Sequence, residues 1–226
     1  MLHLPSCSTS GFPDILSSKD LAVISSALSA AEFVDGRETA GRAAREVKHN
    51  QQLKPGTQSE TTVVELLKQS LQRSALFQMA TRPKAVHSVM VSKYEPGMSY
   101  GTHTDNAFLG SFRSDISFTI FLKPPSEYEG GELTIEDINA ERSYKLNAGS
   151  MLVYPSSTLH RVNPVKVGCR LVAVGWVQSF IRRADQRETL FDLDTVRRSI
   201  FEKEGKSHEF DLISKSVANL FRAWSD

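Results

Sequence analysis

Between Ala85 and Ser179 the chain alternates short apolar runs with turn residues, and this pattern constrains the fold more than any other feature. The runs are rich in β-branched and aromatic residues, and Gly, Pro, Asn and Ser separate them. They cover residues 85–94, 101–106, 114–122, 131–136, 142–146, 150–155, 159–165 and 169–178. Eight such strands leave little room for helices between them. The pattern therefore predicts an antiparallel two-sheet sandwich or barrel, and eight strands suit a jelly roll.

Helical periodicity appears on both sides of this β region. Apolar residues recur every three or four positions in residues 17–33, 59–77, 182–205 and 210–224. The polar, Gly-containing residues 34–56 are expected to form a loop. We therefore expect an α+β protein with a double-stranded β-helix (jelly roll) core and flanking helices. The predicted divisions are an N-terminal helical portion (1–84) packing on the core, the core itself (85–180) and a C-terminal helical extension (181–226).

Charge and cysteine usage exclude several classes of protein. The net charge is +1 and no basic run is present, which argues against a nucleic-acid partner. No stretch approaches the roughly 18 apolar residues of a membrane-spanning helix. The two cysteines, Cys7 and Cys169, form no disulfide framework and no zinc knuckle. Because the first residues also lack the regions of a signal peptide, a cytoplasmic location is expected.

A histidine and an aspartate stand two positions apart in "GTHTDNA", on a predicted strand. Side chains two apart on a strand share a face, so His103 and Asp105 are expected to point into one cavity. His160, on a later strand, would complete a 2-His-1-carboxylate set, which suits Fe(II) and oxygen chemistry. Zinc is the competing metal, although no HExxH motif is present. Each residue alone is also compatible with an ordinary hydrogen-bonding role.

An arginine follows His160 by ten residues, at the start of an apolar strand. A guanidinium inside a sheet interior is costly unless it meets an anion. A dicarboxylate cosubstrate would supply that anion and bind Arg170 through two parallel hydrogen bonds. A structural ion pair and an outward-facing side chain are the alternatives.

With these residues identified, the chain resembles the Fe(II)/2-oxoglutarate dioxygenase superfamily, and within it the prolyl-4-hydroxylase-like bacterial group of PKHD-type hydroxylases. The resemblance rests on "YEPGMSYGTHTDNA", "RSDISFTIFL", "YEGGELTIED", "LNAGSMLVYPSSTLHRVNPV" and "GCRLVAVGWVQS". These motifs cover nearly all of residues 88–179. Linked motifs in the right order are a specific signal.

The resemblance implies a ligand set and a reaction. His103, Asp105 and His160 would bind Fe(II), Arg170 would hold the distal carboxylate of 2-oxoglutarate, and Tyr94 would contact the same cosubstrate unless it is only a core tyrosine. The reaction would use O₂ to couple decarboxylation of 2-oxoglutarate to succinate with hydroxylation of an unactivated C–H, with L-ascorbate as reductant. Six further motif residues are expected to act through backbone shape, packing or substrate contact: Gly130, Gly131, Asp115, Trp176, Tyr100 and Asn106.

The substrate and the assembly stay open at this point. A protein or peptide side chain and a small molecule are both compatible with the motifs, and so are desaturation and demethylation as outcomes. A non-catalytic jelly-roll binding module is the alternative from another class. The last predicted helix carries Leu220 and Phe221, which would serve a homodimer or pack on the sheet.

Overall fold

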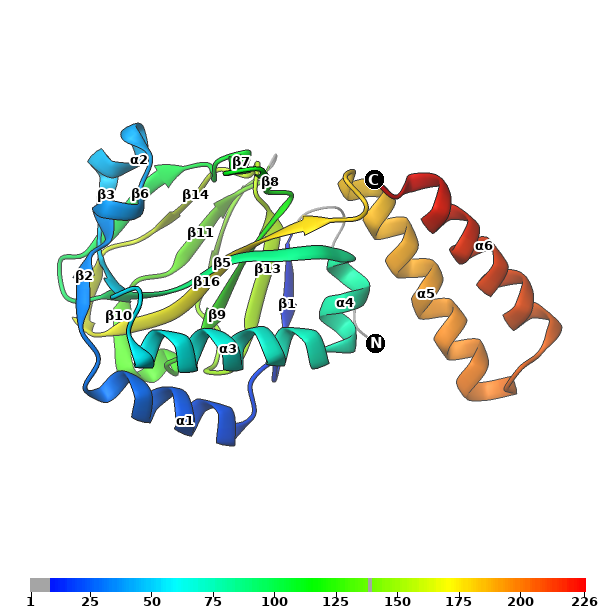
Figure 1. Cartoon of the computed structure of the whole chain (residues 1–226), viewed down its shortest axis with the longest axis horizontal. Helices are drawn as coiled ribbons and strands as arrows, with labels where there is room; N and C mark the ends of the chain where they lie inside the picture. Colours follow the sequence, from blue (N-terminus) through cyan, green and yellow to red (C-terminus); the bar gives the residue numbers. More distant parts are fainter. Residues whose placement is uncertain (1–8, 138–139) are drawn as a thin grey trace.

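Two β-sheets face each other at the centre of the computed structural model, which describes residues 9–137 and 140–226 (Figure 1). The seven-stranded sheet runs in the order β1 (Ser10–Phe12), β13 (Met151–Pro155), β9 (Ile116–Phe121), β16 (Arg170–Ser179), β5 (Pro83–Tyr94), β4 (Gln51–Leu53) and β2 (Phe33–Asp35). The five-stranded sheet runs β12 (Glu141–Tyr144), β11 (Leu133–Glu136), β14 (His160–Val162), β6 (Ser99–His103) and β3 (Lys48–His49). Cys7 lies outside the described residues.

Every strand pairing within the described residues is antiparallel, as the strand spacing predicts. Two short ribbons join the sheets, namely β10 (Tyr128–Gly130) with β15 (Val165–Gly168) and β7 (Phe108–Leu109) with β8 (Phe112–Arg113). A 3₁₀ turn, η2 (Pro125–Glu127), precedes β10.

Strand β9 shows why the central strands read as continuous apolar runs. All six of its residues are buried. Phe118 and Ile120 belong to a hydrophobic cluster with the helices, whereas Phe121 belongs to a second cluster that lies between the sheets. A strand covered on both faces needs no polar side, which explains the apolar run.

Three N-terminal helices cover the outer face of the large sheet: α1 (Ser18–Ser29), α3 (Gln58–Arg73) and α4 (Ala75–Thr81) (Figure 1). Ser17 caps α1 in a capping box with Asp20. Val63, Leu67 and Leu71 of α3 are fully buried, and each contributes about 1.5–3 kcal/mol of apolar burial.

The prediction of a loop over residues 34–56 is wrong. This segment contains β2, the 3₁₀ turn η1 (Gly36–Thr39), the helix α2 (Arg42–Val47), β3 and β4. It passes from the large sheet to the small sheet and back, with β3 pairing with β6 and β4 with β5. The N-terminal portion is therefore strand-bearing as well as helical, while the proposed division points at residues 84 and 180 stay predictions.

The C-terminal residues form two helices, α5 (Ala184–Glu204) and α6 (His208–Trp224), which pack against each other and project beside the core (Figure 1). Helix α5 also contacts α4. Ser207 caps α6. Among the described helices, none has both the length and the apolar character that crossing a bilayer requires.

Candidate active site

Three side chains converge at one end of the space between the sheets. His103 ends β6 and His160 begins β14, and the two residues are direct partners across these strands. Their ring centroids are 4.3 Å apart. Asp105 follows β6, with its Oδ2 atom 3.8 Å from His160 Nε2. One ligand atom from each residue lies within 4.8 Å of the others, so the three sequence-predicted ligands form one potential metal site.

Asp105 lies beside His103 as predicted, but strand alternation does not explain its position, because β6 ends at His103. The backbone N–H of Asp105 donates to the Ser156 carbonyl at 3.3 Å. Ser117 Oγ donates to Asp105 Oδ2 at 2.5 Å, and Ser156 Oγ lies 2.8 Å from Ser117 Oγ. A chain of hydroxyl groups therefore orients the carboxylate. Sequence reasoning missed both serines.

Both histidines present the same nitrogen to the site. The Nδ1 atom of His103 lies 2.8 Å from the Gly101 carbonyl, and that of His160 lies 3.0 Å from the Thr158 carbonyl. A carbonyl only accepts, so each Nδ1 carries the hydrogen and each Nε2 keeps its lone pair for a metal. Burial, and then the neighbouring His160, lower the pKa of His103 to about 4. His103 is therefore neutral at neutral pH, as a metal ligand must be.

Aromatic rings hold the two imidazoles in place. The Tyr100 ring stacks on His103 with centroids 3.6 Å apart. The Tyr154 ring meets His160 edge-on at 5.0 Å. Tyr100 is therefore adjacent to the site, as its sequence position suggests, and Tyr154 is a neighbour that the motifs did not single out.

Arg170 begins β16 directly opposite Tyr94 of β5, and only 1% of it is exposed. Its Cζ atom lies 5.0 Å from the Tyr94 ring centroid. Among the described residues, its Nε and Nη1 atoms have no hydrogen-bond partner and no carboxylate pairs with it. Burial lowers the pKa of Arg170 and also raises that of Tyr94. Arg170 is thus a desolvated cation with no carboxylate of the described residues within 4.0 Å, although Glu132 acts on it electrostatically from further away.

Gly131 makes room for this arginine. Its φ angle is +68°, and a Cβ atom there would lie 3.0 Å from Arg170 Cδ. The expected role of this glycine in backbone shape therefore has a specific basis: a side chain at position 131 would be strained and would displace the arginine stem.

Arg170 and the His/Asp/His cluster line one cavity between the sheets. Tyr94, Asn106 and Trp176 line it too, and the buried Nε1 atom of Trp176 has no partner among the described residues. The cavity wall also contains residues that the sequence reasoning missed: Thr39, Lys48, Asn50, Gln52, Ser117 and Tyr154. The one available sequence signal for this wall was the alternation in "KHNQQ", where Lys48, Asn50 and Gln52 stand two positions apart and would share one face of a strand.

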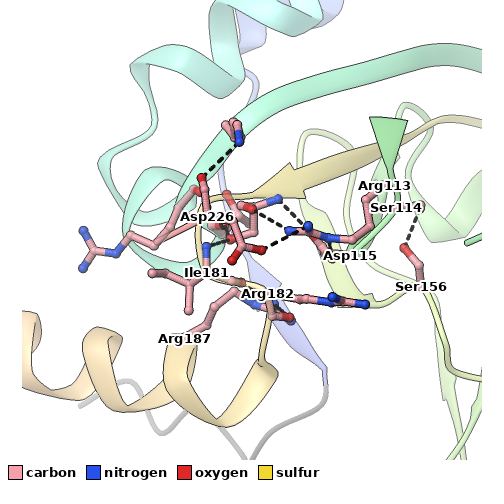
Figure 2. A network of polar contacts seen from close by, with 12 residues as sticks. Arg113, Ser114, Asp115, Ser156, Ile181, Arg182, Arg187 and Asp226 are labelled. Carbon is pink, nitrogen blue, oxygen red and sulfur yellow. Dashed lines mark hydrogen bonds and ion pairs between the residues drawn. The ribbon is translucent and has the colours of Figure 1, made fainter. Parts of the chain in front are cut away.

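Asp115 lies elsewhere. Its carboxylate accepts from Arg113 Nε at 2.6 Å and from the Ser179 N–H at 2.9 Å. Arg113 in turn pairs with Asp226, which follows α6, at 3.1 Å (Figure 2). Only the backbone of Asp115 touches the serine chain, because its carbonyl accepts from the Ser156 N–H at 3.2 Å. The Asp115 side chain therefore binds Arg113 and the end of β16, reaches Asp226 only through Arg113, and gives no direct support to the His/Asp/His cluster.

Comparisons with known proteins agree with this arrangement. The family model of the 2OG-Fe(II) oxygenase superfamily matches residues 89–178. A PKHD-type hydroxylase of Picosynechococcus sp. is 57% identical over 214 residues, which cover 95% of this chain and 98% of that relative. A PKHD-type hydroxylase of Gloeothece citriformis is 58% identical over 216 residues, covering 95% and 98%.

A solved structure supports the fold alone. The crystal structure of a Pseudomonas putida prolyl-4-hydroxylase matches with a TM-score of 0.52 and 21% identity, covering 76% of this chain and 92% of that one. Identity above one half over nearly the full length, together with the gathered His/Asp/His cluster, decides the family. The chain belongs to the PKHD-type hydroxylases, and it is an oxidoreductase of the 2OG-Fe(II) oxygenase superfamily.

Proposed function

We propose that this protein is an Fe(II)- and 2-oxoglutarate-dependent dioxygenase that hydroxylates an unactivated C–H of a protein or peptide side chain or of a small molecule. The observation that carries the proposal is a buried arginine that has no carboxylate partner in the described part of the chain and lines the same cavity as a His/Asp/His cluster. A hydrolytic metal site needs no such second anion site. We also infer that the two facing sheets form the jelly-roll core of this superfamily.

The donor atoms fit iron. His103 and His160 offer neutral Nε2 atoms, and Asp105 offers a carboxylate oxygen that Ser117 orients. Two imidazoles and one carboxylate on one side of a metal leave open positions for a cosubstrate and O₂. The hydrogen bonds from both Nδ1 atoms to backbone carbonyls fix the ring orientations before the metal binds.

The far end of the cavity fits a carboxylate. Arg170 would hold the distal carboxylate of 2-oxoglutarate through charge-assisted hydrogen bonds, with the Tyr94 ring against the guanidinium. Leu133, Val162 and Val174 line the same cavity, and apolar groups beside a polar contact strengthen it by limiting its exposure to water. When bound, iron, O₂ and 2-oxoglutarate supply the oxidant, with succinate and CO₂ as coproducts. L-Ascorbate would keep the iron reduced between turnovers.

The test is an anaerobic titration with Fe(II) and 2-oxoglutarate, followed through the weak visible charge-transfer band of their chelate. The wild type should develop the band, His103→Ala should lose metal binding, and His87→Ala is the matched control. His87 stacks on Phe112 at 4.6 Å and does not line the cavity. If the wild type shows no band but binds Zn(II) and hydrolyses esters or amides, the proposal is wrong.

A further inference from the structure

A row of polar side chains lines the cavity from the segment that joins the two sheets. Lys48, Asn50 and Gln52 alternate along this extended segment and share one face, and we call them the polar wall. They are buried, with exposed fractions of 7%, 3% and 3%. The wall lies outside the family-model match at residues 89–178. The match to the family model therefore gives no information about the wall.

Lys48 is the charged member of the wall. It pairs with Tyr100 across β3 and β6, and its Nζ atom lies 5.3 Å from the Tyr100 ring centroid. Nζ donates to Thr39 Oγ1 at 3.1 Å, and Thr39 Oγ1 lies 2.6 Å from Gln52 Oε1. Within the described ranges no carboxylate lies within 4.0 Å of Nζ. An ammonium group has three donors, so the Thr39 bond leaves two of them for another partner.

The nearby Asp105 does not meet this need once a metal binds. A divalent ion on the His/Asp/His cluster takes the charge of the Asp105 carboxylate for itself. Lys48 then keeps one neutral hydrogen-bond acceptor, Thr39, and the more distant charge of Asp35, so a further anion beside it would stabilise it.

Lys48 and Arg170 serve different parts of the cavity. The groups that act electrostatically on Arg170 include Tyr94, Tyr128 and Tyr154. Lys48 instead lies against Tyr100, the residue that stacks on His103. If Arg170 holds the cosubstrate, Lys48 is left for a second anion on the Tyr100 side of the cluster.

Asn50 adds a second group to the wall that lacks partners among the residues the structure describes. Its amide lies close enough to Tyr94 to lower the pKa of the phenol, yet neither Nδ2 nor Oδ1 makes a hydrogen bond of good geometry with these residues. Buried amide atoms without partners are rare in folded proteins and indicate a place for a polar ligand.

We propose that the polar wall is a substrate subsite, in which Lys48 binds a carboxylate of the substrate and thereby directs a neighbouring C–H toward the His103/Asp105/His160 cluster. The inference rests on the proposed function and names its substrate class, a carboxylic acid. The carboxylate is that of a free acid or that of an acidic side chain in a peptide, and both offer the same chemistry to Lys48.

The test compares matched carboxylate and amide probes by ligand-observed NMR, on protein loaded with Zn(II) in place of iron and with saturating 2-oxoglutarate. N-acetylglycine with its amide represents the free acid. N-acetylglutamate N-methylamide with its glutamine counterpart represents the acidic side chain. Binding of 2-oxoglutarate is measured in the same samples. The variants are Lys48→Met, Lys48→Arg and the control Lys54→Met, whose lysine pairs with Glu32 at 2.9 Å outside the cavity.

We expect the wild type to bind the carboxylate of at least one pair about 10-fold more tightly than the amide, as one charge-assisted hydrogen bond requires. Lys48→Met should abolish the preference, and Lys48→Arg and Lys54→Met should keep it. The pair that shows the preference identifies the source of the carboxylate. Two results would overturn the inference. One is equal binding of acid and amide, and the other is displacement of the probe when more 2-oxoglutarate is added. Failure of 2-oxoglutarate itself to bind would instead refute the proposed function.

If Lys48→Met unfolds, the Lys48→Arg comparison and the wild-type preference still decide the matter. A purely structural Lys48 predicts no acid preference in the folded wild type, whatever the stability of its variants.

Discussion

Replacing Arg170 with methionine separates a functional arginine from a structural one. The side chain is 1% exposed and has no carboxylate partner among the described residues. Replacing buried charge with apolar volume is neutral or stabilising by about 1–4 kcal/mol. The substitution also removes cation–π contacts with Tyr94 and Phe121, at 5.0 and 5.8 Å, together worth about 2 kcal/mol.

The two contributions oppose each other, so the free energy of unfolding of the ligand-free variant should stay within about 2 kcal/mol of the wild-type value, a change in Tm of at most about 8 °C for a chain of this size. The stabilisation that 2-oxoglutarate provides should instead fall sharply. A ligand at 100 times its Kd stabilises the wild type by about 2.7 kcal/mol. Loss of two charge-assisted hydrogen bonds weakens binding at least about 100-fold, which reduces that stabilisation to about 0.4 kcal/mol or less.

The assay is denaturant unfolding of metal-loaded protein with and without 2-oxoglutarate. Arg161→Met is the matched control, because Arg161 already has a carboxylate partner, Glu141, at 2.6 Å. This control should lose at most about 1 kcal/mol and keep the full response to 2-oxoglutarate. The reasoning is refuted if Arg170→Met loses about 3–5 kcal/mol without ligand, as a broken buried ion pair would. An unchanged response to 2-oxoglutarate in this variant would refute it as well.

Three further predictions concern the His/Asp/His cluster and the helical layer. Ser117→Ala removes the hydroxyl that orients Asp105 and should weaken Fe(II) affinity about 10–100-fold, as measured by anaerobic titration. The control is Ser114→Ala, because Ser114 contacts Ser156 at the far end of the serine chain and should change the affinity less. Equal effects of the two substitutions would contradict the role of the direct contact. Asp20→Asn removes half of the α1 capping box and should lower the free energy of unfolding at pH 6 by about 0.5–1 kcal/mol, as measured by denaturant unfolding. Because hydrogen bonds from Ser17 lower the pKa of Asp20 in the folded state, this difference from the wild type should be complete above about pH 4 and should vanish as the pH falls through the folded pKa; a difference that does not depend on pH would contradict it. Leu67→Ala should lower the free energy of unfolding by about 2–5 kcal/mol, because the Leu67 side chain is fully buried. The affinity of the folded protein for 2-oxoglutarate should not change. A large change in this affinity would mean that the helical layer reaches the cavity.

Patterns that depend on hydrophobic alternation were predictable from the sequence. The strands β5, β9, β11, β13 and β16 and the helices α1, α3 and α5 bury apolar residues, so periodicity marks them within a few residues. His103 and His160 also lie on predicted strands, and these two strands pair with each other. The short β7–β8 ribbon was not predicted, because two-residue strands leave no periodic signal.

The polar wall was not predictable in the same way. Residues 48–53 alternate, but the inward positions are polar because they face a polar cavity, so the segment reads as a loop. Asp105 was correctly grouped with His103, but strand alternation does not hold it there. Its backbone N–H donates to the Ser156 carbonyl and its carboxylate accepts from Ser117, and both serines are distant in sequence. The missing partner of Arg170 is likewise a property of three-dimensional packing, which one sequence cannot show.

The most direct test of the central claim is the fate of molecular oxygen in 2-oxoglutarate turnover. Purified protein with Fe(II), L-ascorbate and 2-oxoglutarate is incubated under ¹⁸O₂ with pools of peptides and small carboxylic acids, and succinate and products are measured by mass spectrometry. The account predicts succinate with one ¹⁸O atom and a substrate product heavier by one ¹⁸O atom, and neither should appear with His103→Ala. Consumption of 2-oxoglutarate without labelled succinate would contradict the account. So would the absence of turnover in protein that binds iron, 2-oxoglutarate and, at the polar wall, carboxylic acids.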